Sequence, residues 1–217
     1  MKNSGVPIAK EGVPFLLVFF FATLTLLFSG WKGFAIPLGA LTLFTLYFFR
    51  NPERITPLGN TVVASPADGK IIFVGEVFEG EFLREKALKL SIFMSLWDVH
   101  INRVPLDGTV KDIRHHRGRF LAAFEDRASE ENERNSIFLE TPRGERLVLT
   151  QVAGLVARRI VSYPTIGQFV LKGQRMGLIR FGSRCDIYLP LTAEILVKMG
   201  EHVAGGETVI AKLEEPA

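Results

Sequence analysis

Three short stretches of the chain carry the residue types that nucleophilic and acid–base chemistry needs. The pair Gly182-Ser183 places a hydroxyl directly after a glycine, and Asp68 places a carboxylate in a tight Pro-Ala-Asp-Gly turn. His100 and Arg103 lie at the end of an expected strand. An imidazole can hold and release a proton near neutral pH, and a guanidinium can bind a carboxylate or a phosphate. Each stretch alone is also typical of an ordinary polar turn or strand end, so only their combination points to a reaction.

A basic segment, Arg114-His-His-Arg-Gly-Arg-Phe120, is a further candidate for binding. Its His115, His116 and Arg117 could contact a phospholipid headgroup at a membrane surface, where each basic residue contributes about 1 kcal/mol. A solvated run of charge on a loop accounts for the same residues equally well.

The composition limits the classes of function. The single cysteine, Cys185, excludes an internal disulfide and is expected to be a small core residue. No Cys/His group has the spacing of zinc ligands, so no metal is expected. The net charge of +3 suits an anionic membrane surface, and no motif indicates a nucleic-acid partner.

Two uncharged, apolar runs fill most of the first 49 residues. They cover residues 12–31 and 33–49, with Lys32 between them. A helical membrane span needs about 20 apolar residues, so the first run is long enough and the second is slightly short. We predict that residues 1–49 form a membrane-anchoring helical hairpin, which spans the bilayer or sits deep in one leaflet.

Basic residues on the outer flanks of the hairpin predict its orientation. Lys2 and Lys10 precede it and Arg50 and Arg54 follow it, whereas the turn holds only Lys32. The positive-inside rule then places both ends, and the rest of the chain, on the cytoplasmic side of the cell (inner or plasma) membrane. A signal peptide is the alternative, but the second apolar run and the lack of a small-x-small cleavage site argue against it.

From residue 50 onward the pattern predicts a mainly β (α+β) domain, which extends to residue 217. Prolines and glycines separate short β-branched runs, as in antiparallel sheets. Residues 118–135 are the most helix-compatible stretch, but their many charges favour a loop with one or two helical turns. The expected strands are 61–64, 70–77, 88–94, 137–139, 147–152, 155–161, 177–181 and 186–189.

An internal repeat with a period of 33 residues indicates a barrel-sandwich, lipoyl-like β domain. The segment from Gly167 to Met176 recurs from Gly200 to Val209, and each copy is a glycine turn, a strand position and a second glycine turn. The second copy looks like the first half of a biotinyl or lipoyl domain, and residues 65–71 look like its second half. The two halves therefore stand in permuted order.

Together the motifs resemble those of the phosphatidylserine decarboxylases, in particular their short bacterial and archaeal class. The resemblance covers residues 50–213, about three quarters of the chain, and is highly specific because four motifs occur in the family's order. They are the Pro66-Ala-Asp-Gly69 turn, the Asp98-Val-His100 strand, the Lys172-Gly-Gln-Arg-Met-Gly177 approach and the Phe181-Gly-Ser183 site.

The resemblance implies a proenzyme that breaks its own peptide bond between Gly182 and Ser183. An N-to-O acyl shift and a β-elimination would leave chains of residues 1–182 and 183–217, held together as a heterodimer by shared strands. Without a Cβ, Gly182 can take the backbone conformations that the attack needs. Ser183 would become a pyruvoyl group, a covalent cofactor that forms a Schiff base with the serine amine of phosphatidylserine. Loss of CO₂ would give phosphatidylethanolamine, with His100 protonating the substrate carbon.

Two positions depart from the family's pattern. Many members carry a second histidine, three residues after the first, that joins an aspartate and the serine in a processing triad, and here Arg103 stands in its place. Commoner members have the sequence Gly-Ser-Thr at the cleavage site, whereas this chain has Gly-Ser followed by Arg184. The base for self-cleavage therefore has two alternatives, which are Asp68 acting through His100 or a histidine of the basic segment. Arg103 could instead bind the substrate carboxylate or phosphate.

Two other functions stay open at this level. A non-catalytic, membrane-tethered lipoyl-like adaptor would carry a long coiled coil between its half-motifs, but residues 72–199 lack heptads. The same pyruvoyl chemistry could also act on a soluble amino acid or on archaetidylserine, an ether lipid. The apolar hairpin favours a lipid substrate without distinguishing ester from ether chains. The sequence is compatible with higher oligomers of the heterodimer.

Overall fold

The structure, a computed structural model, describes residues 7–119, 121, 131–154, 159–180 and 182–214. It divides into two units, Met1–Glu53 and Arg54–Ala217. The first unit is helical, and the second consists of β-strands and the turns between them. The mainly β fold with an N-terminal apolar hairpin, predicted from the sequence, is therefore confirmed.

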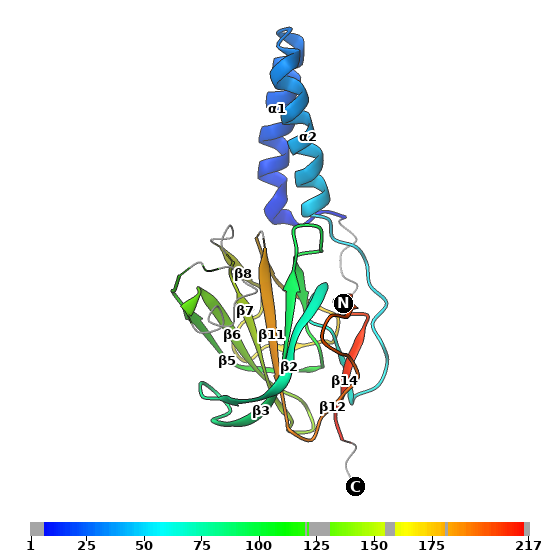
Figure 1. The fold of residues 1–217 in the computed structure, drawn as a ribbon, viewed down its shortest axis with the longest axis vertical. Coiled ribbons are helices and arrows are strands. Elements are labelled where there is room, and N and C mark those ends of the chain that lie inside the picture. The colour runs from blue at the N-terminus through cyan, green and yellow to red at the C-terminus, as the bar shows by residue number, and fades with distance from the viewer. Residues whose placement is uncertain (1–6, 120, 122–130, 155–158, 181, 215–217) are drawn as a thin grey trace. The chain divides into compact units, whose positions relative to one another are not determined.

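Two apolar helices, α1 (Val13–Phe28) and α2 (Lys32–Phe48), form the hairpin after a short 3₁₀ turn, η1 (Lys10–Gly12). They run antiparallel beside each other (Figure 1). Threonine hydroxyls in both helices donate to the carbonyl four residues earlier, as Thr23 does at 2.7 Å and Thr42 at 2.8 Å. These bonds satisfy hydroxyl groups that apolar surroundings could not.

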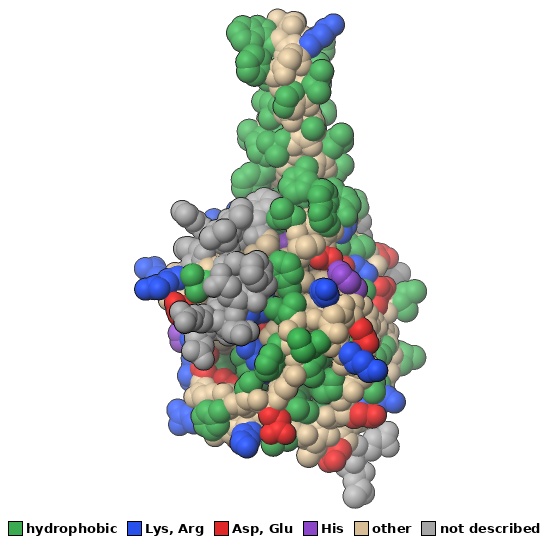
Figure 2. All heavy atoms as spheres, in the orientation of Figure 1, with side chains coloured by type: hydrophobic (Ala, Val, Ile, Leu, Met, Phe, Trp, Pro, Cys, Tyr) green, Lys and Arg blue, Asp and Glu red, His purple; other side chains and the backbone are tan. Residues whose placement is uncertain are grey.

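The surface of the hairpin is apolar. Figure 2 shows hydrophobic side chains over most of its visible face. Residues 10–28 form a helical segment of 19 residues that is long and apolar enough to cross a membrane, whereas α2 is shorter. A helix rises about 1.5 Å per residue, so the hydrocarbon core of about 30 Å needs about 20 residues. The first helix therefore meets the length of a span, as the sequence predicted.

The described part of the β unit contains strands in three sheets. Eight strands form one sheet in the order β13-β2-β3-β11-β7-β6-β5-β9, and the others form the sheets β1-β14-β12 and β4-β10-β8. The strands are β1 (Val62–Ala64), β2 (Gly69–Glu79), β3 (Glu85–Met94), β4 (Ile101–Arg103), β5 (Gly108–His116), β6 (Arg134–Glu140), β7 (Arg146–Val152), β8 (Ile160–Ser162), β9 (Phe169–Val170), β10 (Arg175–Ile179), β11 (Ser183–Leu189), β12 (Glu194–Ile195), β13 (His202–Val203) and β14 (Val209–Lys212). Their pairings are antiparallel.

The eight-stranded sheet curls around the hydrophobic core (Figure 1). Alternate residues of β11, namely Cys185, Ile187 and Leu189, belong to this core and are fully buried. Burial raises the pKa of the Cys185 thiol above its ordinary value, so the thiol stays protonated and unreactive. The prediction that Cys185 is a small core residue is confirmed.

Most predicted strands are present, but β5 was missed. Its charged end, Arg114 to His116, was interpreted as a loop, and that interpretation is wrong for these residues. The pairing of β5 with β6 continues as far as His116 opposite Arg134, because pairing with an existing sheet outweighs the weak β-propensity of charged residues. The predicted strand over 155–161 and the helix-compatible stretch 118–135 fall largely outside the described residues.

The repeat extends to the segments against which its two copies pack. Residues 65–71 and 104–110 share the pattern Pro-x-Asp-Gly followed by a β-branched residue two positions later. Each segment makes the same backbone bonds to its own glycine hairpin, so the β unit contains an internal duplication. The bonds run from Gly206 N to Ser65 O (2.7 Å), Gly173 N to Val104 O (2.8 Å), Gly200 N to Ile71 O (2.8 Å) and Gly167 N to Val110 O (2.8 Å).

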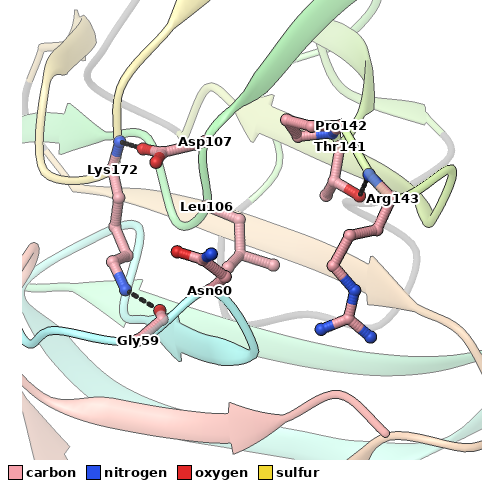
Figure 3. Close-up of a pocket in the computed structure, with 8 residues that line it drawn as sticks. All are labelled: Gly59, Asn60, Leu106, Asp107, Thr141, Pro142, Arg143 and Lys172. Carbon is pink, nitrogen blue, oxygen red and sulfur yellow. Dashed lines mark hydrogen bonds between the residues drawn. The ribbon is translucent and has the colours of Figure 1, made fainter. Parts of the chain in front are cut away.

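An aspartate fixes the second glycine turn in each copy. Asp68 Oδ1 accepts a hydrogen bond from Gly205 N at 2.7 Å, and Asp107 Oδ1 accepts one from Lys172 N at 2.6 Å. Figure 3 shows the second bond, in the wall of a cavity of about 100 Å³, together with the bond from the Lys172 ammonium to the Gly59 carbonyl. Because both copies share this bond, one role of Asp68 is to hold the fold.

Removal of residues 1–49 is expected to leave a folded β unit, because its core residues all lie between Val63 and Leu213. The truncated chain keeps Arg54 and its ion pair with Asp68. Circular dichroism should show a β spectrum with a cooperative thermal transition, without the detergent that the exposed apolar hairpin demands. A truncated chain with no cooperative transition would contradict the independence of the two units.

Candidate functional site

Ser183 is buried at the start of a central strand. It is the first residue of β11 and pairs with Met94 of β3. Its exposed fraction is 0%, and its Oγ has no hydrogen-bond partner among the described residues. Burying a polar group without a partner costs about 1–3 kcal/mol, so such a hydroxyl calls for an explanation beyond packing.

Gly182 gives the backbone before Ser183 an unusual conformation. Its φ of +62° lies in the left-handed region that favours glycine. A Cβ added at this position would meet no described atom within 4 Å. The backbone therefore takes a left-handed conformation at Gly182, while the Ser183 hydroxyl is buried. The neighbouring Phe181 lies outside the described residues.

The strand that follows His100, β4, and the start of β11 come together at Met94. Met94 lies opposite Ser183 in the pairing of β3 with β11. Asn102 of β4 reaches the same side chain, with its Nδ2 atom 3.6 Å from Met94 Sδ. His100 directly precedes β4, and its carbonyl accepts a bond from Ile179 N at 3.3 Å. Two of the three predicted stretches thus meet in one region.

His100 is fully buried, and the turn before it holds its ring. Its Nδ1 lies 2.9 Å from the Asp98 carbonyl oxygen. A carbonyl can only accept, so Nδ1 carries the proton and Nε2 is the basic nitrogen of the neutral ring. The Asp98 carboxylate fixes this turn by accepting bonds from Ser95 N at 2.8 Å and Ser95 Oγ at 2.6 Å.

Asp68 is held by two partners. Its Oδ2 lies 2.6 Å from Arg54 Nη2, and its Oδ1 accepts the Gly205 bond. Burial raises the pKa of the Asp68 carboxyl above its ordinary value, and the charge of Asp98 adds to this, while the bonds to Gly205 and Arg54 oppose it. Asp68 therefore lies within electrostatic range of the turn that orients His100.

Arg103 lies between the two copies of the duplication. Its Nη1 donates to the Gly173 carbonyl at 2.9 Å, and a Cβ added to Gly206 would come within 2.6 Å of its Cδ. Burial, Arg175 and Arg54 lower the pKa of Arg103 to about 10. The charges of Asp68 and Glu207 oppose this shift, and the guanidinium keeps its charge at neutral pH.

The structure does not bring the basic segment to Ser183. His115 lies 3.5 Å from Glu133 and His116 lies 2.5 Å from Glu81, measured from Nε2 to a carboxylate oxygen. Both histidines belong to β5, which β6 and β7 separate from β11. At about 4.8 Å per strand this is about 14 Å. Arg117 follows β5 and is exposed.

Arg184, which stands where commoner relatives have threonine, points away from the Ser183 side. Successive residues of a strand face opposite sides of a sheet. Arg184 Nε lies 3.0 Å from Asp186 Oδ1, and Lys89 Nζ lies 3.3 Å from Asp186 Oδ2. Arg184 therefore belongs to a buried ion cluster behind the site.

Sequence reasoning missed Arg54 and Gln151. Arg54 was interpreted only as a flanking charge of the hairpin, although it bridges Asp68 and Glu207, 153 residues away in the chain. Gln151 is fully buried. The sequence contains a signal for Gln151. It stands at the next alternate position after Leu147 and Leu149, which are on the core side of β7, and a polar residue at such a position indicates a buried hydrogen bond.

Comparison with known proteins identifies the family of the chain. A model of the phosphatidylserine decarboxylase family matches residues 41–211. The phosphatidylserine decarboxylase proenzyme of Geotalea uraniireducens (strain Rf4) is 50% identical over 213 residues, 98% of this chain and 100% of the relative. The proenzyme of Syntrophotalea carbinolica is 45% identical over 214 residues, 99% of this chain and 100% of the relative. The proenzyme of Geobacter sulfurreducens is 48% identical over 218 residues, which cover 98% of this chain and 100% of the relative.

The family match covers both the predicted motifs and the strands that bring them together. It favours an enzyme over the adaptor that the sequence alone left open, and it confirms the predicted class, a decarboxylase made as a proenzyme. The chain belongs to the phosphatidylserine decarboxylase family.

Proposed function

We propose that the chain cuts its own Gly182–Ser183 bond and then converts phosphatidylserine to phosphatidylethanolamine and CO₂ with a pyruvoyl group derived from Ser183. The observation that carries this proposal is the buried Ser183 hydroxyl without a partner among the described residues, next to a glycine of positive φ. The relatives are named proenzymes, which supports a chain that is processed before it acts.

Self-cleavage would proceed through an ester. Ser183 Oγ attacks the Gly182 carbonyl carbon, its proton passes to a base, and the carbon–nitrogen bond breaks as the nitrogen gains a proton. A base then removes the Cα proton of Ser183, and the Cβ–oxygen bond breaks to release the Gly182 carboxylate. Water converts the remaining dehydroalanine to a pyruvoyl group with loss of ammonia. Asp68 acting through His100 is the base that we propose, since His115 and His116 lie three strands away.

The two product chains would stay together as a heterodimer. In the intact chain β11 lies between β3 and β7, and β14 pairs with β1. These contacts join residues after the cut to residues before it. The new terminus at Ser183 would thus remain held by backbone pairing on both sides of its strand.

In turnover the chain's own residues would bind the substrate and transfer one proton to it. When present, the pyruvoyl ketone takes up the serine amine and accepts the electron pair left by CO₂. The buried Ser183 position fits such a group, and no described atom lies within 4 Å of a Cβ built at the preceding Gly182. His100 Nε2 would take a proton from the substrate ammonium and later deliver it to the substrate carbon. Arg103 binds the substrate carboxylate or phosphate, for which its retained charge is suited.

The helical hairpin would hold the enzyme at its substrate. A lipid substrate resides in a bilayer, and α1 has the length and apolar surface to enter one. We propose a location at the cell membrane with the β unit facing the cytoplasm, as the flanking basic residues favour. The residues of the basic segment after Arg114 are proposed to contact lipid headgroups at the membrane surface.

Replacing Ser183 by alanine is expected to leave one uncleaved chain of 24.2 kDa with no decarboxylase activity, because neither the ester nor the pyruvoyl group can form. Ser183→Cys should still cleave slowly, since a thiol also supports an acyl shift. Intact mass spectrometry decides both. Ser91→Ala is the matched control, since Ser91 is also buried in this sheet with an Oγ that lacks a partner among the described residues. It should cleave normally. A normal small chain from Ser183→Ala would sink the proposal.

Replacing His100 by alanine is expected to lower turnover at least about 100-fold, the usual scale for a missing general acid, and to slow self-cleavage. Turnover is measured per pyruvoyl group, so that incomplete processing does not count as lost catalysis. His115→Ala should leave the rate of self-cleavage unchanged, because its strand is remote from Ser183. The assignment fails if His100→Ala turns over normally, or if it cleaves itself at the normal rate while His115→Ala does not.

Asp68→Asn and Asp107→Asn form a matched pair that separates the fold from the chemistry. An asparagine oxygen can still accept the turn bond in either copy, so both variants should fold with similar melting temperatures. Asp68→Asn should process slowly, because it loses the negative charge beside the His100 turn, whereas Asp107→Asn should process at the normal rate. Gel analysis of cleavage over time tests this. Equal rates in the two variants would remove Asp68 from the mechanism.

A further inference from the structure

Three buried amide side chains form a directional chain through the β unit. Asn135 Nδ2 on β6 donates to Gln151 Oε1 on β7 at 3.2 Å, and Gln151 Nε2 donates to Asn102 Oδ1 on β4 at 2.9 Å. The exposed fractions are 4% for Asn135 and 0% for the other two. Each amide thus donates to the next, and the last one, Asn102, has its nitrogen at the free end.

That nitrogen ends beside Met94, the residue opposite Ser183. Its acceptor is Met94 Sδ at 3.6 Å, and a thioether is a weak acceptor. Ser183, on the facing strand, carries the buried Oγ without a partner among the described residues. An amide donor with a poor acceptor and an unbonded hydroxyl therefore occur together in one region of the core.

The fold makes room for this chain at Gly177. Gly177 lies opposite Asn102 in the pairing of β10 with β4. A Cβ at this position would come within 2.9 Å of Gln151 Nε2 and 2.2 Å of the Val161 carbonyl oxygen. Any side chain here would displace the Gln151 amide or separate β10 from β8. Because glycine occupies the position, the Gln151 amide can reach Asn102.

Stability alone does not account for the chain. Moving amides out of water costs free energy unless every donor and acceptor finds a partner. Apolar side chains of similar volume would fill the same space without that cost. Here the amides bond to one another, whereas the Asn102 nitrogen at the end of the chain has a thioether as its acceptor among the described residues. This pattern fits a donor that is held ready for an oxygen that forms transiently.

We propose that the Asn102 amide stabilises the negative oxygen that forms on Gly182 during self-cleavage. The inference rests on the proposed function. As the bond from Ser183 Oγ to the Gly182 carbon forms, the carbonyl π electrons move onto the Gly182 oxygen, and they return when the carbon–nitrogen bond breaks. A preorganised donor lowers the barrier to this step. Gln151 and Asn135 are positioning residues, which keep the Asn102 nitrogen turned toward Met94.

The main test is the rate of self-cleavage of full-length Asn102→Leu in detergent, followed by gel from the start of cell-free synthesis. Losing one oxyanion donor costs about 100- to 1,000-fold, so we expect slowing of at least about 100-fold. Thr150→Val is the matched control, because it removes a buried bond of 3.1 Å to Ser136 on the opposite face of β7. It should lower the melting temperature comparably and cleave at the normal rate.

A second variant, Gln151→Met, tests the positioning role without burying a charge or changing the volume greatly. We expect it to slow cleavage about tenfold, a typical coupling between contacting residues. In the Asn102→Leu background the same change should add no further slowing. A merely structural Gln151 would instead give additive effects on the rate.

The outcomes separate this inference from the proposed function. A wild-type chain that stays intact overturns both. A wild-type chain that cleaves, with a folded Asn102→Leu that cleaves equally fast, overturns the role of Asn102 and leaves the proposed function standing. If Asn102→Leu does not fold, Gln151→Met decides, and a normal rate in that variant overturns the inference.

Discussion

The antiparallel pairing of β11 with β3 and β7 is the constraint on which the site depends. It sets Ser183 against Met94 and directs its hydroxyl into the core. A slip of one residue would turn every side chain of β11 to the other face. Arg184 would then enter the apolar core, and Ser183 would face the ion cluster. Apolar residues on one face and the Arg184–Asp186 pair on the other therefore specify a single register.

The duplication separates what the fold requires from what the chemistry adds. Asp68 and Asp107 make the same turn bond, but Asp68 alone in this pair has an arginine partner, Arg54, and lies near the charge of Asp98. Asp107 instead accepts its turn bond from the backbone of Lys172. The Lys172 ammonium donates to backbone carbonyls. One scaffold thus presents two similar carboxylates in different electrostatic surroundings, and these surroundings are what the proposed chemistry would use.

Local patterns predicted the parts of this protein that depend on local physics. The apolar runs gave the hairpin, and β-branched runs between glycines and prolines gave most strands. Motifs brought Ser183 and His100 into one hypothesis, although their proposed roles stay predictions. The pattern failed where partners are distant in sequence. Arg54 looked like a flanking charge because Asp68 and Glu207 reach it only in the folded chain, and β5 looked like a loop because β6 supplies its pairing.

Among the described residues, the Ser183 side of the scissile bond is tightly packed and the Gly182 side is not, and the proposed reaction needs both kinds of surroundings. Attack and elimination at Ser183 profit from a dry interior, where aimed donors act strongly because little solvent screens them. Hydrolysis of dehydroalanine and entry of a lipid amine need access, and among the described residues no atom lies within 4 Å of a Cβ built at Gly182. Since β11 begins at Ser183, the cut would fall just before the first residue of the strand. It would therefore not interrupt the paired part of β11. The pairing that buries the hydroxyl before the cut would therefore keep the new terminus in place after it.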